Sequence, residues 1–212
     1  MKQVDKTAYR FSSYAHIERF ASYFYQLENI FKSDPKNVLE IGVGDGVVKD
    51  YIKGNTAIEY MSVDVADDLH PDVVGSVTKL PFQDSTFDVV CAFEVLEHVP
   101  FAQFEQALSE LARVSRSTVL LSLPHFGPPI SFSFKIPFLP TIRFFLKIPF
   151  PQKHIFNGQH YWEVGKKGYS ARMIKNILSK YFIIEKDFVP FESPYHHFYC
   201  LEAREDKKRV VW

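Results

Sequence analysis

The chain alternates between two hydrophobic periods. Residues 14–31 carry large apolar side chains three and four positions apart, which predicts an amphipathic helix that ends before Pro35. These side chains are Tyr14, Ile17, Phe20, Phe24, Leu27 and Phe31. Short and mainly apolar runs follow, and they predict buried strands. The runs cover residues 38–41, 59–63, 72–74, 87–92 and 118–123.

The segments between and after these runs have helical spacing. One helix is expected after residue 46, a second after Pro100, and a third after Ser170, whose side chain is a suitable N-cap. Two further strands, near 182–188 and 197–203, are expected to pair as a hairpin. Strands that alternate with helices and are apolar throughout predict an α/β fold, in which a parallel sheet is covered on both faces.

A single domain with four parts accounts for the 212 residues, since a domain averages about 150 residues. The parts are an N-terminal helical segment at 1–35, a core at 36–124, an insert at 125–168, and a C-terminal helix with strands at 169–203. The insert breaks the regular alternation, because residues 125–160 hold eight Phe and six Pro but no Asp or Glu. The insert is therefore the most individual part of the chain.

Charge and cysteine content limit the possible classes of protein. The 25 Lys and Arg residues balance the 25 Asp and Glu residues, which argues against a nucleic-acid partner held by bulk phosphate attraction. Two cysteines, Cys91 and Cys200, exclude a disulfide-rich scaffold and fit a reducing compartment. The first residues lack the apolar segment of a signal peptide, and no apolar run approaches the ~20 residues that span a bilayer. We therefore expect a cytoplasmic protein.

A glycine-rich turn follows the first expected strand and suits a ligand. Gly42, Gly44 and Gly46 lack Cβ atoms, so the backbone there approaches a ligand closely, although any turn between a strand and a helix is able to use glycine. The spacing G-x-G-x-G differs from the G-x-G-x-x-G that holds a pyrophosphate. Glu40 precedes the turn and favours a cationic ligand, while Asp64 ends the next strand and suits a ribose diol. S-adenosylmethionine has a ribose and a positive charge but no phosphate.

Four segments of the sequence resemble the class I S-adenosylmethionine-dependent methyltransferases. They are NVLEIGVGDG (37–46), SVDV (62–65), VVGSVTKLPFQDSTFDVVCAFEVLEHV (73–99) and RVSRSTVLLSLP (113–124). The sequence is most similar to the small-molecule group with an LPF…FD-V…LEH pattern. This resemblance implies a Rossmann-like three-layer sandwich, in which a seven-stranded, mostly parallel sheet has an antiparallel last strand and binds the cofactor at the carboxyl ends of its first strands.

The same resemblance implies roles for residues around the cofactor. The three glycines of the turn would line the methionine and ribose portion beside Glu40, and Asp64 would hold the ribose hydroxyls. Ser76 stands where the family often has an aspartate that contacts adenine, and its neutral hydroxyl is a weaker acceptor than a carboxylate. Phe93 and Glu94 would face the methionine end of the cofactor.

Histidines are the candidates for catalysis, because an oxygen acceptor needs a base. His125 directly follows the fifth expected strand, and His160 belongs to the sequence HYWE that returns from the insert. Either histidine is equally able to pin a loop by hydrogen bonds. His196 and His197 are adjacent on an expected strand and would point to opposite faces, so no metal site is expected.

Residues 126–151 of the insert combine aromatic side chains with prolines and three cations. One interpretation is a packed lid over the acceptor pocket, with Phe144 and Phe145 buried. A second is a basic, aromatic surface that contacts a membrane or a lipid-linked substrate. A third is a surface for a protein partner. The pattern alone does not choose among them.

The predicted function is methyl transfer from S-adenosylmethionine to a small acceptor, or to one linked to a lipid or a glycan. Two alternatives stay open, a non-catalytic module that binds the cofactor or a partner, and an NAD-dependent oxidoreductase, which the glycine spacing disfavours. No nucleic-acid partner is expected. If residues 126–151 form an interfacial surface, we expect them to make peripheral contact with the inner face of a membrane.

Overall fold

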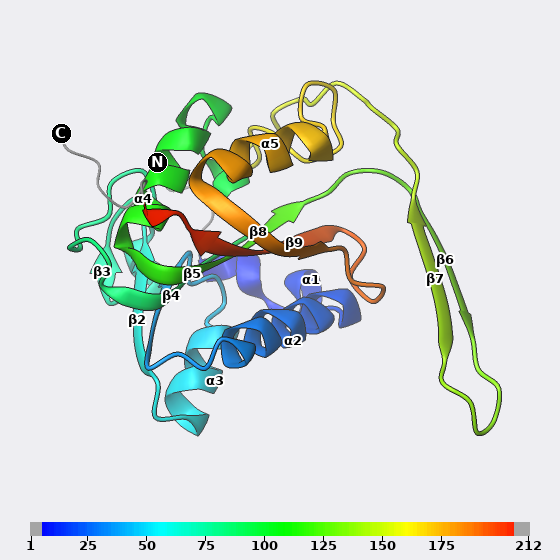
Figure 1. Ribbon diagram of the computed structural model, residues 1–212, viewed down its shortest axis with the longest axis horizontal. Coiled ribbons are helices and arrows are strands. Elements are labelled where there is room, and N and C mark those ends of the chain that lie inside the picture. Colours follow the sequence, from blue (N-terminus) through cyan, green and yellow to red (C-terminus); the bar gives the residue numbers. More distant parts are fainter. Residues whose placement is uncertain (1–5, 206–212) are drawn as a thin grey trace.

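The computed structural model describes residues 6–205 (Figure 1). A central seven-stranded sheet has the strand order β3-β2-β1-β4-β5-β9-β8. Its strands are β1 (Asn37–Ile41), β2 (Glu59–Asp64), β3 (Val73–Val74), β4 (Phe87–Phe93), β5 (Ser115–Pro124), β8 (Phe182–Phe188) and β9 (His196–Ala203). Only β9 is antiparallel to its neighbours, β5 and β8. The expected α/β sheet with an antiparallel last strand is confirmed.

Helices cover both faces of this sheet and make three layers (Figure 1). The helices α2 (Ile17–Lys32) and α3 (Val47–Asn55) lie on one face, and α4 (Phe104–Val114) and α5 (Ala171–Tyr181) lie on the other. Successive side chains of a strand point to opposite faces. Val38 of β1 therefore joins a core with Ile30 of α2, while the next residue, Leu39, joins a core with Leu108 of α4.

Short elements complete the chain and confirm one predicted cap. They are η1 (Lys6–Tyr9), α1 (Phe11–Tyr14), η2 (Asp67–Leu69), η3 (Leu96–His98) and η4 (Phe101–Gln103). The side chain of Ser170 accepts a hydrogen bond of 3.2 Å from the backbone N–H of Met173, so α5 begins where the sequence predicted. None of the helices in residues 6–205 has the length and apolarity needed to cross a membrane.

The amphipathic helix α2 turns its apolar stripe outward. Ile17, Phe20, Phe24 and Phe31 are exposed, whereas the buried side chains are mostly polar or have a polar end. The buried residues are Ser22, Tyr23, Gln26, Asn29 and Ile30. Tyr23 donates a hydrogen bond to Asp45 in the turn after β1, and Asn29 accepts one from Cys200 of β9. The helix is placed by these contacts, so its large apolar side chains are left at the surface.

The insert forms a hairpin of β6 (Pro129–Phe134) and β7 (Ile142–Lys147), which extends away from the central sheet (Figure 1). Alternate residues of the paired strands give this hairpin one wholly apolar face. Its members are Ile130, Phe132, Phe134, Ile142, Phe144 and Leu146, all between 49% and 59% exposed. The interpretation that Phe144 is buried in a packed lid is wrong, because 53% of the residue is exposed, while Arg143 and Lys147 on the opposite face of the hairpin contact the body of the protein.

Candidate active site

A cavity of about 470 Å³ lies where β1, β2 and β4 end. This edge is the carboxyl end of the parallel strands, where open α/β sheets bind ligands. The residues predicted to bind the cofactor that line it are Glu40, Gly42, Gly44, Asp64, Ser76, Phe93 and Glu94. Gly46 lies at the start of α3 as its N-cap residue. Small-molecule sites have volumes of about 300–1,000 Å³, so the structure brings these residues together around a cavity of suitable size.

The turn after β1 requires glycine at two positions that face the cavity. Gly42 and Gly44 have positive φ angles of 82° and 57°, which residues with a Cβ atom rarely adopt. A Cβ atom on Gly42 would also lie 2.4 Å from a methyl carbon of Val95. The N–H of Gly42 donates a hydrogen bond of 2.8 Å to the carbonyl of Val63, which fixes the turn against the end of β2. The cavity is therefore bordered here by bare backbone.

Asp64 is held in place by two backbone groups. One carboxylate oxygen accepts a hydrogen bond of 2.9 Å from the N–H of Val43, and the other accepts one of 2.8 Å from the N–H of Ala66. Each carboxylate oxygen is able to accept a second hydrogen bond. Because Asp64 also lines the cavity, these remaining positions suit a pair of neighbouring hydroxyls such as those of a ribose.

Glu40 is a buried carboxyl group at the same edge of the sheet. Only 4% of the residue is exposed, and Tyr60 donates a hydrogen bond to Oε2. Burial raises the pKa of Glu40 to about 8, while the hydrogen bond from Tyr60 acts in the opposite direction. A positively charged ligand in the cavity would stabilise the ionised form, so this position favours a cation over a phosphate.

Glu94 directly follows β4 and is strained. Its φ angle of 55° lies in the left-handed region, which costs a residue with a side chain about 1–2 kcal/mol. Burial raises the pKa of Glu94 to about 7, and the positive charge of Arg19 lowers it. Among residues 6–205, the buried Oε1 atom has no hydrogen-bond partner. Backbone strain and an unpartnered polar atom at one residue are typical of a functional site.

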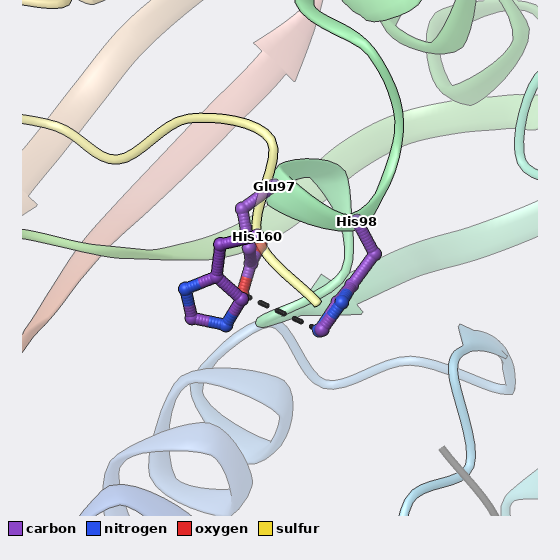
Figure 2. A group of neighbouring side chains, drawn as sticks. All are labelled: Glu97, His98 and His160. Atoms are coloured by element: carbon purple, nitrogen blue, oxygen red, sulfur yellow. Dashed lines mark ion pairs between the residues drawn. The ribbon is translucent and has the colours of Figure 1, made fainter. Parts of the chain in front are cut away.

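We call the part of the cavity next to Glu94 its acidic end. It is lined by Glu94, Glu97, His98 and His160, and the last three side chains meet there. Figure 2 shows Glu97 and His98 on the short helix η3, with His160 approaching from the segment that returns from the insert. An oxygen of Glu97 lies 3.9 Å from Nε2 of His98 and 4.0 Å from Nε2 of His160. Burial lowers the pKa of His98 to about 4, so its ring is neutral at pH 7.

His125, the other histidine proposed for catalysis, lies elsewhere. Its ring stacks on that of His197 with centroids 5.1 Å apart, and their Nδ1 atoms are 3.1 Å apart. Burial, together with the charge of Lys147, lowers the pKa of His125 to about 3. His125 is not among the residues that line the cavity, whereas His160 is.

Comparison with known proteins finds a family match for part of the chain. Residues 39–123 match the family model described as a methyltransferase domain. This methyltransferase-like segment covers about two fifths of the chain. The matched segment contains the glycine turn, Asp64 and Glu94. Comparison with the curated proteins finds no significant match.

Solved structures of the same fold share little sequence identity with the chain. The magnesium protoporphyrin IX methyltransferase ChlM from Synechocystis PCC 6803 is 12% identical, with a TM-score of 0.58 over 89% of this chain and 84% of that one. The glycopeptide N-methyltransferase MtfA is 11% identical, with a TM-score of 0.56 over 96% and 94%. The PH0226 protein from Pyrococcus horikoshii OT3 is 16% identical, with a TM-score of 0.54 over 87% and 92%. The fold of a methyltransferase therefore extends beyond the matched segment.

The residues that line the cavity fit S-adenosylmethionine. Bare glycine backbone and the oriented Asp64 suit a nucleoside, and the carboxyl groups of Glu40 and Glu94 suit its positive charge. The orphaned Oε1 of Glu94 marks a place where a polar ligand group would complete the hydrogen bonding. Ser76 also lines the cavity, although its hydroxyl already contacts the Thr78 hydroxyl at 2.9 Å, so its predicted contact with adenine stays a prediction.

N-terminal side chains form a wall of the cavity that the sequence did not identify. Tyr9, Tyr14, Arg19 and Tyr23 all line it. The rings of Tyr9 and Tyr14 meet edge to face at 4.8 Å, and the Arg19 guanidinium lies 4.5 Å from the centre of the Tyr14 ring. The hydroxyl of Tyr23 donates a hydrogen bond of 2.6 Å to Asp45 in the glycine turn. The sequence offered one signal, a group of tyrosines ahead of the first strand. Their helical spacing is explained by packing alone and does not indicate a cavity.

Proposed function

We propose that the protein transfers the methyl group of S-adenosylmethionine to a small or lipid-linked acceptor, which reaches the acidic end of the cavity. The observation that carries this proposal is the size of the cavity together with the residues that line it. Its volume is about 470 Å³, and the N-terminal tyrosines and residues 159–161 wall it. A site of this size has room for the cofactor and for the reacting group of an acceptor, which favours a small molecule over a folded protein.

The names of two fold neighbours support the same class of acceptor. The name of ChlM refers to a magnesium porphyrin, and the name of MtfA refers to a glycopeptide. The porphyrin and the glycopeptide are both compact molecules. A glycan or a lipid head group presents a reacting group of similar size. The remainder of a lipid-linked acceptor would stay outside the cavity.

The residues of the chain bind and orient the reactants. Bound S-adenosylmethionine supplies a methyl group on a positively charged sulfur. Asp64 and the glycine turn hold one end of the cofactor, and Glu94 supplies negative charge near the other. We assign the acceptor contact to His160 and not to His125, because His160 lines the cavity. Orientation alone is able to supply effective concentrations of about 10⁵ M or more.

An acceptor screen tests this proposal. The purified protein would be incubated with methyl-labelled S-adenosylmethionine and, separately, with lipid, small-metabolite, protein and RNA fractions of a cell extract. We expect label in the lipid or small-metabolite fraction, and none with an Asp64→Ala variant as the control. Label that enters only protein or RNA would contradict the proposal.

We also propose that the hairpin of β6 and β7 rests on an anionic lipid surface. Its apolar face of six side chains is roughly half exposed throughout, and Phe138 in the connecting loop is fully exposed. Removing each half-exposed side chain from water would contribute about 1 kcal/mol. Contiguous apolar surface of this kind, rimmed by polar groups, marks an interaction site. Residues 125–160 contain no Asp or Glu that would repel anionic lipid.

The cations of residues 125–160 divide into two groups. The ammonium group of Lys147 turns inward and donates to the carbonyls of His125 and Pro194, and burial lowers its pKa to about 8. Arg143 pairs with Glu192. Lys135 and Lys153 are exposed, so they are the cations that would meet lipid head groups, at about 1 kcal/mol each.

Cosedimentation with vesicles tests the hairpin proposal. We expect binding to phosphatidylserine-containing vesicles at low salt, weaker binding at high salt, and little binding to phosphatidylcholine alone. Phe132→Ser combined with Phe144→Ser removes one cross-strand pair and should release the protein. Phe20→Ser combined with Phe24→Ser is the matched control, because it removes two exposed aromatics from α2. Wild-type protein that stays in the supernatant with every lipid would contradict the proposal.

A further inference from the structure

The acidic end of the cavity holds three side chains in an arrangement that methyl transfer by itself does not require. Glu97 and His98 are neighbours on η3, and His160 comes from the insert (Figure 2). The rings of the two histidines meet edge to face, with centroids 5.0 Å apart. One ligand-type atom from each of the three side chains lies within 4.8 Å of the other two.

Hydrogen bonds at the far side of each ring set the tautomers. Nδ1 of His98 lies 3.2 Å from the carbonyl oxygen of Gln159, and Nδ1 of His160 lies 3.0 Å from a carboxylate oxygen of Glu163. These oxygens accept, so each Nδ1 donates and, in the neutral ring, the lone pair lies on Nε2. Both Nε2 atoms are those nearest to Glu97. A histidine that binds a metal commonly donates its other N–H to a carboxylate or a carbonyl in this way.

The surroundings of Glu97 independently indicate that its carboxyl group lacks a binding partner. The residue is fully buried, and among residues 6–205 neither carboxylate oxygen has a hydrogen-bond partner. Burying a carboxylate without a partner costs several kcal/mol. The nearest nitrogens, Nε2 of His98 and Nε2 of His160, lie 3.9 and 4.0 Å from a Glu97 oxygen, which is beyond hydrogen-bond distance. A cation bound between the three side chains would give the Glu97 carboxyl group a partner.

We propose that Glu97, His98 and His160 bind a divalent metal ion. Two imidazole nitrogens and one carboxylate oxygen form a ligand set that favours Zn²⁺ and similar transition metals over Mg²⁺ and Ca²⁺. Ligand atoms around a tetrahedral zinc lie roughly 3.4 Å apart. The separations of 3.9 and 4.0 Å from Glu97 exceed this value, so a bound ion would draw the three side chains closer together.

The three protein ligands leave a coordination position that faces the cavity. The following role rests on the proposed function: an oxygen of the methyl acceptor occupies that position. A metal-bound hydroxyl loses its proton to water near neutral pH more readily than a free one. The acceptor oxygen then forms the bond to the methyl carbon, and the carbon–sulfur bond breaks with its electron pair on sulfur. The acceptor is accordingly an alcohol, a phenol or an enol, and His160 acts as a ligand rather than as the base.

Titration with Zn²⁺ tests the metal site directly. The full chain, freed of metal by a chelator, would be titrated by calorimetry, with Mg²⁺ as the comparison ion. We expect one Zn²⁺ per chain and much weaker binding of Mg²⁺. His160→Gln and Glu97→Gln should each weaken Zn²⁺ binding at least tenfold. His125→Gln is the matched control, because it removes a histidine that lies outside the cavity, and it should bind Zn²⁺ as wild type does.

A measurement on the unmodified protein makes the test independent of how the variants fold. Co²⁺ in place of Zn²⁺ should give visible absorption bands of a four- or five-coordinate site, which Zn²⁺ then abolishes. Absence of stoichiometric Zn²⁺ binding, or wild-type affinity in the folded His160→Gln variant, would overturn the proposal. Binding of S-adenosylmethionine is measured on the same samples. Retained cofactor binding without metal binding would refute the metal site alone, whereas the reverse would refute the proposed function.

Discussion

Tyr60 donates a hydrogen bond to the carboxyl group of Glu40 across the paired strands β1 and β2. Burial, followed by the nearby Glu40, raises the pKa of the Tyr60 phenol, so the phenol keeps its proton and remains the donor. Glu40 is therefore oriented by a neighbour within the sheet while it also lines the cofactor cavity. We therefore expect a change at Glu40 to alter both the stability of the fold and cofactor binding.

Replacing Glu40 with Gln should weaken cofactor binding and raise the stability of the folded protein. The pKa of Glu40 is about 8 in the folded protein, above its ordinary value of 4.5. The folded state holds a proton that the unfolded state releases, so the Glu40 contribution to stability is lost as pH rises between about 4.5 and about 8. Glu40→Gln removes this dependence. At about pH 9 we expect it to raise the free energy of unfolding by roughly 1–3 kcal/mol.

Urea denaturation at about pH 6 and about pH 9 measures this effect. Calorimetry with S-adenosylmethionine should show about tenfold weaker binding to the same variant, equivalent to ~1.4 kcal/mol. A variant whose stability follows the same pH dependence as wild type would contradict the assignment of the raised pKa to Glu40.

Asp64→Asn should weaken cofactor binding with only a small loss of stability. The amide keeps one oxygen acceptor but loses the charge, and a hydrogen bond to a charged group contributes about 1.5–3 kcal/mol. We expect affinity to fall by about 10- to 100-fold. Asp64→Ala should lower the melting temperature as well, because it leaves the N–H groups of Val43 and Ala66 without their partner. Thermal unfolding with and without S-adenosylmethionine measures both effects.

Gly42→Ala should damage the cofactor site, and Gly54→Ala should not. The added Cβ at Gly42 would lie 2.4 Å from Val95, at a positive φ of 82°. At Gly54, inside α3, no atom lies within 4 Å of an added Cβ. Alanine there should stabilise the helix by about 0.5–1 kcal/mol. Equal cofactor affinity in the two variants, measured by calorimetry, would show that the turn after β1 tolerates a side chain.

The N-terminal tyrosines should slow the release of the cofactor. Tyr9 lies beside Gly44 and packs against Tyr14, so the pair covers the glycine turn. Tyr9→Ala combined with Tyr14→Ala should raise the dissociation rate about tenfold, for the loss of ~1–2 kcal/mol of apolar contact. Tyr51→Ala is the control, because Tyr51 is exposed on α3 and does not line the cavity. Stopped-flow displacement of the cofactor compares the rates, and an unchanged rate in the double variant would exclude the covering role.

The sequence by itself determined the sheet and the cofactor side of the cavity. The alternation of strands and helices, the glycine turn and the position of Asp64 after the second strand are local features, set by neighbours along the chain. Parallel strands bring their carboxyl ends to one edge. Glu40, Gly42, Asp64 and Glu94 therefore meet in one cavity as the sequence predicted, although their individual contacts with the cofactor remain predictions.

Only the tertiary structure decided the rest of the site. Helical spacing could not show that α2 is held by Tyr23 and other polar side chains, which leaves its apolar stripe outside. Alternation in the insert could not show that strand pairing turns Phe144 outward. His160 joins Glu97 because the chain returns from the insert to η3, where the N–H of Tyr161 donates a hydrogen bond of 2.8 Å to the carbonyl of Glu97. Contacts between distant segments depend on packing, and no local pattern of residues encodes them.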